Sequence, residues 1–434
     1  MSRIVTATAA LAFFALTSLT AAVAPATAAA APAPNALTGL SAVKHVWVVV
    51  LENENADNTF GDNSPAPYLS KTLPSMGAFI PQYFGVGHES LDNYIAMISG
   101  QAPNPSTQSD CQDYLDFAPS SPVIDGNDQA VGAGCVFPSS VGTLPGQLDA
   151  AGLTWRGYME DMGTPCRHPA LNTQDQTQKA KVGDQYAARH DPFMYFHSII
   201  DDDPSCQAHV VDLGGLTADL GTVATTPNFS FITPNLCHDG HDSPCVDKQP
   251  GGLLSADEFL KQWVPAITDS PAFKHDGLLL VTFDEGETGG PSSATACCGE
   301  VAGPNSPLPG IDGPGGGRVG AVALSPFIAP GTTSGAAYNH YALLRSVEDI
   351  FGLDHLGMAG GASLQSFGFD VLTAAPGAPS SSGVEASGAI KPEAVSSPSA
   401  RLATTGRSVP MSVWLAAVAL LAALVAFRIR RSTR

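Results

Sequence analysis

Positive charge is scarce in this chain: 20 lysine and arginine residues stand against 40 aspartate and glutamate residues, for a formal net charge of −20. No basic patch or arginine-rich run interrupts this acidity, which argues against nucleic acid as a partner. The sequence also lacks an internal repeat, and it lacks the repeated Cys-x-x-Cys spacing of a zinc cluster. We interpret the acidity as a source of solubility outside the cell.

The N-terminus predicts export. Residues 1–30 hold a short basic region at Arg3, an apolar stretch from Ile4 to Val23, and small-residue cleavage sites within residues 26–30. A buried N-terminal helix is the alternative, but the tract that follows is rich in proline and alanine. We therefore expect a secretory signal peptide.

The C-terminus predicts an anchor. Residues 374–408 are rich in alanine, proline, serine and glycine, which is typical of a disordered stalk. Residues 409–427 predict a transmembrane segment and residues 428–434 a basic cytoplasmic tail. Just upstream, Leu402-Ala-Thr-Thr-Gly406 resembles a sortase cell-wall sorting signal. We expect sortase as a partner and attachment to the cell wall, with a plain single-pass membrane anchor as the alternative.

Eight cysteines in the exported part indicate disulfide bonds, because their number is even. The pairing is open, but sequence proximity favours Cys111 with Cys135, Cys166 with Cys206, and Cys237 with Cys245. The neighbours Cys297 and Cys298 could close on each other only with strain.

Residues 31–373 remain as one catalytic domain, and short apolar runs mark its strands. The clearest are His45–Leu51, Asn228–Pro234 and Gly277–Phe283. Runs this short and apolar are typical of buried parallel strands. We expect an α/β fold with a mostly parallel sheet, helices on both faces, and a site at the carboxyl ends of the strands.

Polar side chains follow each of these runs, which predicts one convergent site for divalent metal ions. They are Glu52 and Asn53 after the first run, Asp239 and His241 after the second, and Asp284 and Glu285 after the third. Carboxylate and amide oxygens suit a hard ion such as Mg, Mn or Ca, whereas added imidazoles suit Zn, Mn or Fe.

Ser90 is the candidate nucleophile. The apolar spacing of Asn93–Ser99 predicts a helix that Gly100 ends, so Ser90 falls at the helix N-terminus, which favours anions. A serine there could be only an N-cap. Its neighbours favour a catalytic role, because His88 and Asn93 flank it and a serine beside a metal ion is a strong nucleophile.

Taken together, these blocks resemble the phosphoesterase family of bacterial phospholipases C and secreted acid phosphatases, within the alkaline phosphatase superfamily. The similarity is greatest to actinobacterial secreted acid phosphatases that act on phosphoinositides. It spans about His45 to Leu353 and is carried by Glu52-Asn53-x-x-x-Asp57-x-x-Phe60-Gly61, His88-x-Ser90-x-x-Asn93-Tyr94, Pro234-Asn235, Asp239-x-His241-Asp242, Asp284-Glu285, His340 and Arg189-His190.

The resemblance implies a role for each matched residue. Ser90 is implied to accept the phosphoryl group and to bind metal, and Asn93 to hydrogen-bond a phosphoryl oxygen. His88 and His190 are implied to lie in the site without a separable role. Asp92 stands where the family commonly has proline, which would add negative charge near the phosphate. The implied metal ligands are Glu52, Asn53, Ser90, Asp239, His241, Asp284, Glu285 and His340.

The expected activity is metal-dependent hydrolysis of phosphoric monoesters through a phosphoserine, with retention at phosphorus. This would make the chain an acid phosphatase, in the manner of a phosphatidylinositol-3-phosphatase. A phosphodiesterase of phospholipase C type is the alternative within the enzymes. A sulfatase is disfavoured because Ser90-Leu-Asp-Asn-Tyr94 lacks the Cys/Ser-x-Pro-x-Arg core. The alternative from another class is a non-catalytic, wall-displayed binding protein on a hydrolase scaffold.

Overall fold

The structure is a computed structural model that describes residues 40–373 except 290–292 and 300. The predicted signal peptide, stalk, sorting-like motif, transmembrane segment and basic tail all lie outside the described residues. Among the residues that are described, no helix combines the length and the apolar character needed to cross a membrane.

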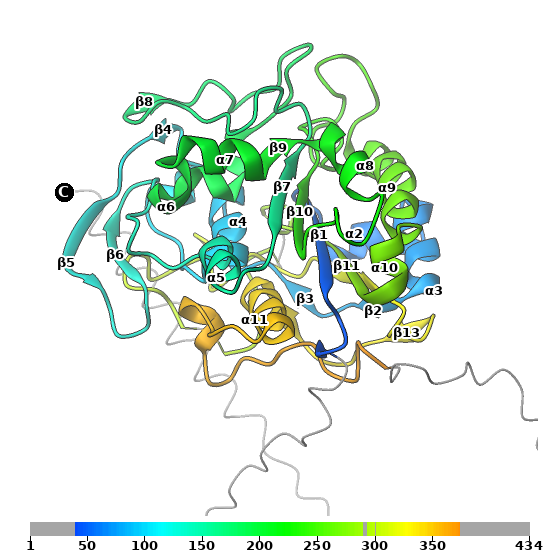
Figure 1. Ribbon diagram of the computed structural model, residues 1–434. Coiled ribbons are helices and arrows are strands. Elements are labelled where there is room, and N and C mark those ends of the chain that lie inside the picture. The colour runs from blue at the N-terminus through cyan, green and yellow to red at the C-terminus, as the bar shows by residue number, and fades with distance from the viewer. Residues whose placement is uncertain (1–39, 290–292, 300, 374–434) are drawn as a thin grey trace, which may run out of the picture. The chain divides into compact units, whose positions relative to one another are not determined.

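An eight-stranded, mostly parallel sheet forms the centre of the described fold (Figure 1). Its five parallel strands lie in the order β11, β1, β10, β7, β9, while β12 runs antiparallel between β11 and β2, and β13 pairs parallel to β2 at the edge. The strands are β1 (His45–Leu51), β2 (Ala78–Ile80), β7 (Trp155–Met159), β9 (Val210–Asp212), β10 (Phe229–Thr233), β11 (Gly277–Phe283), β12 (Ala321–Leu324) and β13 (Thr332–Thr333).

Helices cover both faces of this sheet, as expected. Figure 1 shows α4, α5 and α11 on one side of the central strands and α9 and α10 on the other. The helices are α2 (Ala56–Phe60), α3 (Leu73–Met76), α4 (Ser90–Ser99), α5 (Leu144–Ala150), α6 (His197–Ile200), α7 (Asp203–His209), α8 (Leu216–Asp219), α9 (Gly252–Thr268), α10 (Pro271–Asp276) and α11 (His340–Phe351). The predicted α/β class is therefore confirmed.

Smaller elements build the loops around the sheet. Three two-stranded ribbons are β3 (Tyr83–Phe84) with β14 (Tyr338–Asn339), β4 (Asp113–Tyr114) with β8 (Thr173–Gln174), and β5 (Ala118–Ile124) with β6 (Ala130–Ala133). Short helical turns occupy Tyr68–Thr72, Thr107–Ser109, Ala188–His190, Pro192–Tyr195, Leu213–Gly215 and Gly357–Gly360.

The register of the central strands brings their polar ends together. Strand β1 is buried on both faces along its whole length, which is why its sequence is almost continuously apolar rather than alternating. Leu51 of β1 pairs with Phe283 of β11. The next residues, Glu52 and Asp284, therefore leave the sheet side by side at its carboxyl edge.

All eight cysteines form disulfides within the described residues. The three pairs favoured by sequence proximity are confirmed: Cys111–Cys135, Cys166–Cys206 and Cys237–Cys245. The neighbours Cys297 and Cys298 are also bonded to each other.

Candidate active site

Three strand ends meet at one site, as the sequence predicts. The backbone N–H of Asn53 donates to Asp284 Oδ1 at 2.9 Å, and the Asn53 side-chain amide donates to Glu285 Oε1 at 2.6 Å. The Glu52 backbone N–H donates to the Asp239 carbonyl at 2.8 Å. The segments after β1, β10 and β11 are therefore tied to one another directly.

Ser90 is the first residue of α4, three residues earlier than the apolar spacing alone suggests. The helix ends where expected, because Gly100 adopts the left-handed conformation (φ 66°) that favours glycine. The Ser90 hydroxyl donates to Glu52 Oε2 at 2.8 Å. Tyr94, one turn further along α4, donates to the other oxygen, Glu52 Oε1, at 2.5 Å. Glu52 is thus held by two side chains of the helix that carries Ser90.

His190 packs beneath this cluster. Its Nε2 lies 3.4 Å from Glu52 Oε2, its Nδ1 lies 3.9 Å from Asp239 Oδ2, and its ring stacks on Tyr94 at 5.4 Å between centroids. Burial, and then the nearby positive charge of Arg189, lower the pKa of His190 well below its usual value. His190 is therefore a neutral imidazole that lies between Glu52 and Asp239, and neither of its nitrogens is hydrogen-bonded among the described residues.

Four buried carboxyl groups gather at the strand ends: those of Glu52, Asp239, Asp284 and Glu285. Burial raises the pKa of Asp239 to about 7. Burial first, and then repulsion by neighbouring carboxylates, raise the pKa values of the other three well above the usual range. These groups cannot all be ionised without a compensating positive charge.

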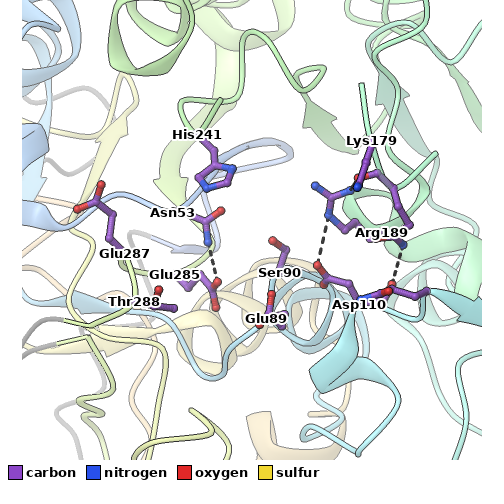
Figure 2. Close-up of a pocket in the computed structure, with 12 residues that line it drawn as sticks. Asn53, Glu89, Ser90, Asp110, Lys179, Arg189, His241, Glu285, Glu287 and Thr288 are labelled. Carbon is purple, nitrogen blue, oxygen red and sulfur yellow. Dashed lines mark hydrogen bonds and ion pairs between the residues drawn. The ribbon is translucent and has the colours of Figure 1, made fainter. Parts of the chain in front are cut away.

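A pocket of about 670 Å³ opens above Ser90. Figure 2 shows Asn53, His241 and Glu285 on one side of Ser90, and Asp110, Lys179 and Arg189 on the other. The pocket therefore has a wall built from the strand ends and a second wall built from the segment before β4 and the segment after β8.

Arg189 and Asp110 are site residues whose role the sequence did not predict. Arg189 Nε lies 3.3 Å from Asp110 Oδ2, and both side chains are largely buried. Asp110 Oδ1 also accepts from the Leu91 backbone N–H at 3.0 Å, at the start of α4. Burial raises the pKa of Asp110 to about 6, although its contact with Arg189 opposes that shift. The Arg189-His190 block was the available signal for Arg189, whereas no motif marked Asp110.

Asn93 has a different place from the expected one. Its side-chain oxygen accepts from the backbone N–H groups of Val86 and Gly87, and its amide donates to the carbonyls of Gly87 and Glu89 and, at 3.4 Å, to Glu285 Oε2. It is fully buried and does not line the pocket. The structure thus gives no support to the expected phosphoryl contact, because Asn93 holds the loop that precedes Ser90.

His340 also departs from its expected role as a metal ligand. Its Nε2 faces the backbone carbonyl of Asp284, and its Nδ1 lies 3.2 Å from the Tyr83 hydroxyl. Burial lowers the pKa of His340 to about 4. The neutral ring therefore donates to Asp284 and accepts from Tyr83, which leaves neither nitrogen for a metal and makes His340 a positioning residue.

The remaining predicted residues lie at the rim or behind the site. His241 lines the pocket, with a half-exposed side chain 3.3 Å from Asp242 Oδ1. His88 lies behind Glu285, with its Nδ1 2.6 Å from Glu285 Oε2. Asp92 is buried, and burial and neighbouring carboxylates raise its pKa well above its usual range. Burial therefore opposes the extra negative charge expected at Asp92.

The donor set fits a divalent cation. Oδ2 of Asp239 and Oδ2 of Asp284 are buried and have no hydrogen-bond partner among the described residues. Within the same part of the chain, one trio of metal-type side chains has its ligand atoms within 4.8 Å of one another: Cys237, Cys245 and Asp247. That trio is no metal site, because its two cysteines form a disulfide. The acidic strand ends are the better candidate.

Known proteins are similar to this chain over much of its length. A "probable acid phosphatase" from Kluyveromyces lactis is 26% identical over 320 residues, which cover 73% of this chain and 60% of that protein. A "phosphate-repressible acid phosphatase" from Penicillium chrysogenum is 26% identical over 289 residues, covering 67% and 55% respectively. The "phosphatidylinositol-3-phosphatase" of Mycobacterium tuberculosis is 24% identical over 327 residues, covering 75% and 82%. The chain thus spans little more than half the length of the two fungal relatives.

Among solved structures, a protein of the alkaline phosphatase superfamily from Vibrio parahaemolyticus aligns with a TM-score of 0.44 and 11% identity. The alignment covers 73% of this chain and 69% of that one. This similarity is too weak to support any inference about chemistry.

The family comparison is more decisive. The model of the Phosphoesterase family matches residues 66–354, which is most of the described domain and includes Ser90, Arg189, Asp239 and Asp284. Glu52 and Asn53 lie upstream of the match but join the same site through their contacts with Ser90, Asp284 and Glu285. The match covers well over half of the chain, and the protein belongs to the Phosphoesterase family.

Proposed function

We propose that the protein is a metal-dependent phosphoric monoester hydrolase, an acid phosphatase that acts through a phosphoserine at Ser90. The observation that carries this proposal is the contact between the Ser90 hydroxyl and Glu52 Oε2 at 2.8 Å, at a helix N-terminus that opens into the pocket. The three relatives described above are all named as phosphatases, which supports a monoester over a diester.

Glu52, Asn53, Asp284 and Glu285 are the proposed ligands of a divalent cation, with Ser90 and Asp239 beside them and His241 at the rim. The support is the group of buried carboxyl groups with raised pKa values and unpartnered oxygens. Such an ion would neutralise these charges and lower the pKa of the Ser90 hydroxyl. An oxygen-rich set favours a hard ion such as Mg, Mn or Ca.

The chain's own residues account for the remaining steps. Glu52 Oε2 is placed to take the Ser90 proton as Ser90 Oγ attacks phosphorus in line and the bond from phosphorus to the alcohol oxygen breaks. The leaving oxygen takes a proton from solvent, and Glu52 returns its proton to Ser90 Oγ in the second step. Arg189, held by Asp110, is placed to balance charge on the phosphoryl oxygens. Water then hydrolyses the phosphoserine, which regenerates Ser90 and releases phosphate. Two in-line displacements retain configuration at phosphorus.

The test is hydrolysis of p-nitrophenyl phosphate and of bis-p-nitrophenyl phosphate by the purified protein, with and without a chelator. Ser90→Ala should lower kcat by about 10⁴-fold or more, because loss of a nucleophile is among the largest single effects on an enzyme. Ser99→Ala is the matched control, since it changes a serine at the far end of the same helix. We expect the Ser99 variant to stay within about tenfold of the wild type.

Acid quench of the wild type during turnover of a substrate with a radiolabelled phosphate should trap the labelled phosphoryl group on Ser90. Label on a histidine, or an active Ser90→Ala variant, would contradict the assignment of the nucleophile. Preference for the bis-ester would instead indicate a phosphodiesterase.

A further inference from the structure

The pocket above Ser90 lacks the apolar lining that is typical of small-molecule sites. Every described residue that lines it carries a polar or charged side chain, whereas ligand pockets are usually lined mainly by aliphatic and aromatic groups. A volume of about 670 Å³ leaves room for more than a phosphate group. The space beyond the phosphate is therefore shaped to receive the alcohol part of a substrate.

The wall beside Arg189 is held rigidly. The Gln178 side-chain amide donates to the Asp110 carbonyl and to Asp175 Oδ2, both at 2.9 Å, and the Gln178 carbonyl accepts from Arg189 at 3.0 Å. Gln112 lines the same wall with an exposed side chain, so its amide is available to a ligand. Preorganised polar groups of this kind discriminate better than mobile ones, because less freedom is lost on binding.

Carboxylates and a hydroxyl line the rim away from Arg189, whereas Lys179 is exposed on the side of Arg189. Glu89, Glu287 and Thr288 line the pocket and are exposed. Figure 2 shows Glu287 and Thr288 on the side of Asn53, across Ser90 from Arg189. Carboxylates accept hydrogen bonds from hydroxyl groups, and on this side of the pocket they repel anionic groups.

This lining favours the binding of some classes of phosphate ester over others. An alkyl or acyl chain would contact only polar and charged side chains and would leave their polar groups without partners. A nucleobase would find no phenylalanine, tyrosine or tryptophan ring on which to stack among the lining residues. A chain or ring of hydroxyl groups can donate to the carboxylates and accept from the amide of Gln112.

We infer that the substrate is the monophosphate of a neutral polyol, such as a sugar, a sugar alcohol or an inositol, and that Gln112 is one of the residues that select its hydroxyl groups. This inference rests on the proposed phosphatase activity for its chemistry, but it concerns the alcohol part of the substrate and can be tested by binding alone.

Glucitol 6-phosphate and hexyl phosphate make a matched pair of probes, since each has six carbons and one terminal phosphate. Titration calorimetry with the metal-loaded Ser90→Ala variant should give a Kd for glucitol 6-phosphate that is at least about tenfold lower than the Kd for hexyl phosphate. Turnover by the wild type should show the same preference in kcat/KM. Equal affinity for the two esters, or tighter binding of hexyl phosphate, would overturn the inference.

Gln112→Leu tests the assigned residue, because leucine has a similar size but no amide. The preference for glucitol 6-phosphate over hexyl phosphate should fall by about fivefold or more. Gln176→Leu is the control, since Gln176 is an exposed glutamine that precedes Gln178 but does not line the pocket. A preference that is unchanged in Gln112→Leu, or reduced equally in Gln176→Leu, would refute the role of Gln112.

A phosphoinositide headgroup presents the same polyol chemistry as a free inositol phosphate. A final binding comparison distinguishes the lipid from the soluble ligand. Soluble inositol 3-phosphate should bind the Ser90→Ala variant at least as tightly as phosphatidylinositol 3-phosphate in phosphatidylcholine vesicles. Binding to the vesicles alone would place recognition outside the pocket and overturn the inference. Polyol binding without hydrolysis of any monoester would support it while contradicting the proposed activity.

Discussion

Asp110 joins two parts of the pocket that are far apart in the sequence. One carboxylate oxygen holds the N-terminus of the Ser90 helix at Leu91, and the other lies 3.3 Å from Arg189 Nε. A single side chain therefore sets the position of the proposed nucleophile relative to the nearest buried cation. Such an arrangement acts through geometry rather than through contact with the reacting atoms.

Asp110→Asn keeps a hydrogen-bond acceptor for Leu91 but removes the charge that orients Arg189. We expect kcat/KM for p-nitrophenyl phosphate to fall roughly tenfold, or by about 1.4 kcal/mol, because a charge-assisted contact becomes a neutral one. Asp184→Asn is the matched control, since Asp184 pairs with Arg167 outside the pocket. Equal losses in both variants would show that the effect is general rather than local.

His340 shows how a residue of metal-ligand type can serve the site indirectly. We expect His340→Gln to keep its full metal content, because neither ring nitrogen faces the carboxyl cluster. The same variant should lose about 1–3 kcal/mol of folding stability, since the buried Asp284 carbonyl and Tyr83 hydroxyl lose their shared partner. Elemental analysis and thermal unfolding of the purified variant measure the two effects. Loss of the metal from a folded variant would restore His340 to the ligand set.

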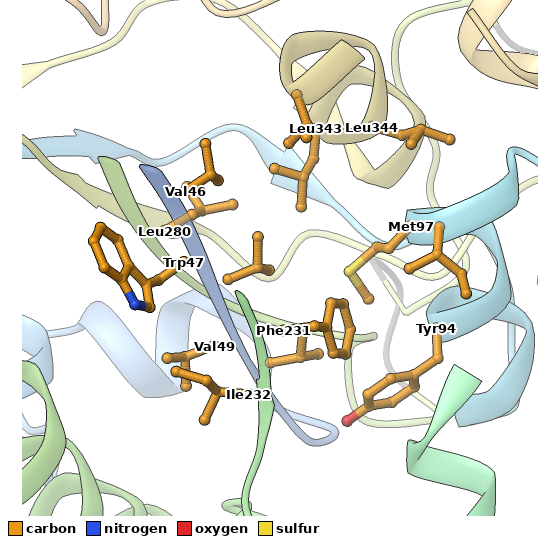
Figure 3. Packing of buried hydrophobic residues seen from close by; sticks show 14 of the residues in the cluster. Val46, Trp47, Val49, Tyr94, Met97, Phe231, Ile232, Leu280, Leu343 and Leu344 are labelled. Atoms are coloured by element: carbon orange, nitrogen blue, oxygen red, sulfur yellow. The ribbon is translucent and has the colours of Figure 1, made fainter. Parts of the chain in front are cut away.

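At the scale of elements, α11 packs in the core against α4, the helix that begins at Ser90. Figure 3 shows Leu343 and Leu344 of α11 on the same side of β1 as Met97 and Tyr94 of α4, while Trp47 points to the opposite side. Glu348 also lies on this helix and is fully buried. Its Oε1 accepts from the Leu356 backbone N–H at 2.8 Å, and its Oε2 has no hydrogen-bond partner among the described residues.

Burial raises the pKa of Glu348 from 4.5 to about 8. The folded protein therefore binds this proton more tightly than the unfolded chain does. The contribution of Glu348 to stability is greatest below the unfolded pKa and falls as the pH rises from about 4.5 toward 8. Glu348 thus makes the fold less stable at neutral pH than at acid pH.

Glu348→Gln removes this titration and keeps an oxygen for Leu356. At pH 7.5 the variant should be more stable than the wild type by about 1–3 kcal/mol, and the difference should shrink toward zero at pH 5. Denaturant unfolding at both pH values measures the change. Glu258→Gln, on the exposed surface of α9, is the control and should show no such trend. A difference that does not depend on pH would contradict the interpretation.

At the scale of the whole molecule, the chain combines a folded domain with terminal segments that predict export and anchoring. The order of Leu402–Gly406, an apolar segment and a basic tail supports the proposal that sortase links the protein to the cell wall. A catalytic domain outside the cell would act on phosphate esters of the medium, which agrees with a wide polar pocket.

The anchoring proposal predicts the outcome of cell fractionation. Digestion of the wall with a muramidase should release the protein, and detergent alone should not, because the link would be covalent. A variant with Thr404 and Thr405 both changed to alanine should move to the detergent-soluble or medium fraction. Extraction of the intact wild type by detergent, with Arg434 still present, would show an ordinary membrane anchor.

By itself, the sequence determined the fold class, the strands of the site and the residues that follow them. Strand runs such as His45–Leu51 and Gly277–Phe283 are local patterns, and parallel strands must deliver their next residues to one edge. Helix α4 was predictable for the same reason, since Gly100 and the apolar spacing mark it locally. The three favoured disulfides were also predictable, because each joins cysteines that are neighbours in the order of the chain.

Only the tertiary structure decided which polar side chains face the pocket. Asn93 and His340 carry suitable groups, but packing turns them mainly toward the loop before Ser90 and toward Asp284 and Tyr83, away from the pocket. Asp110 and Arg189 meet because separate loops fold onto the start of α4. The direction of a side chain depends on helix rotation and loop path, which are set by contacts between distant segments. Short-range sequence patterns carry no record of those contacts.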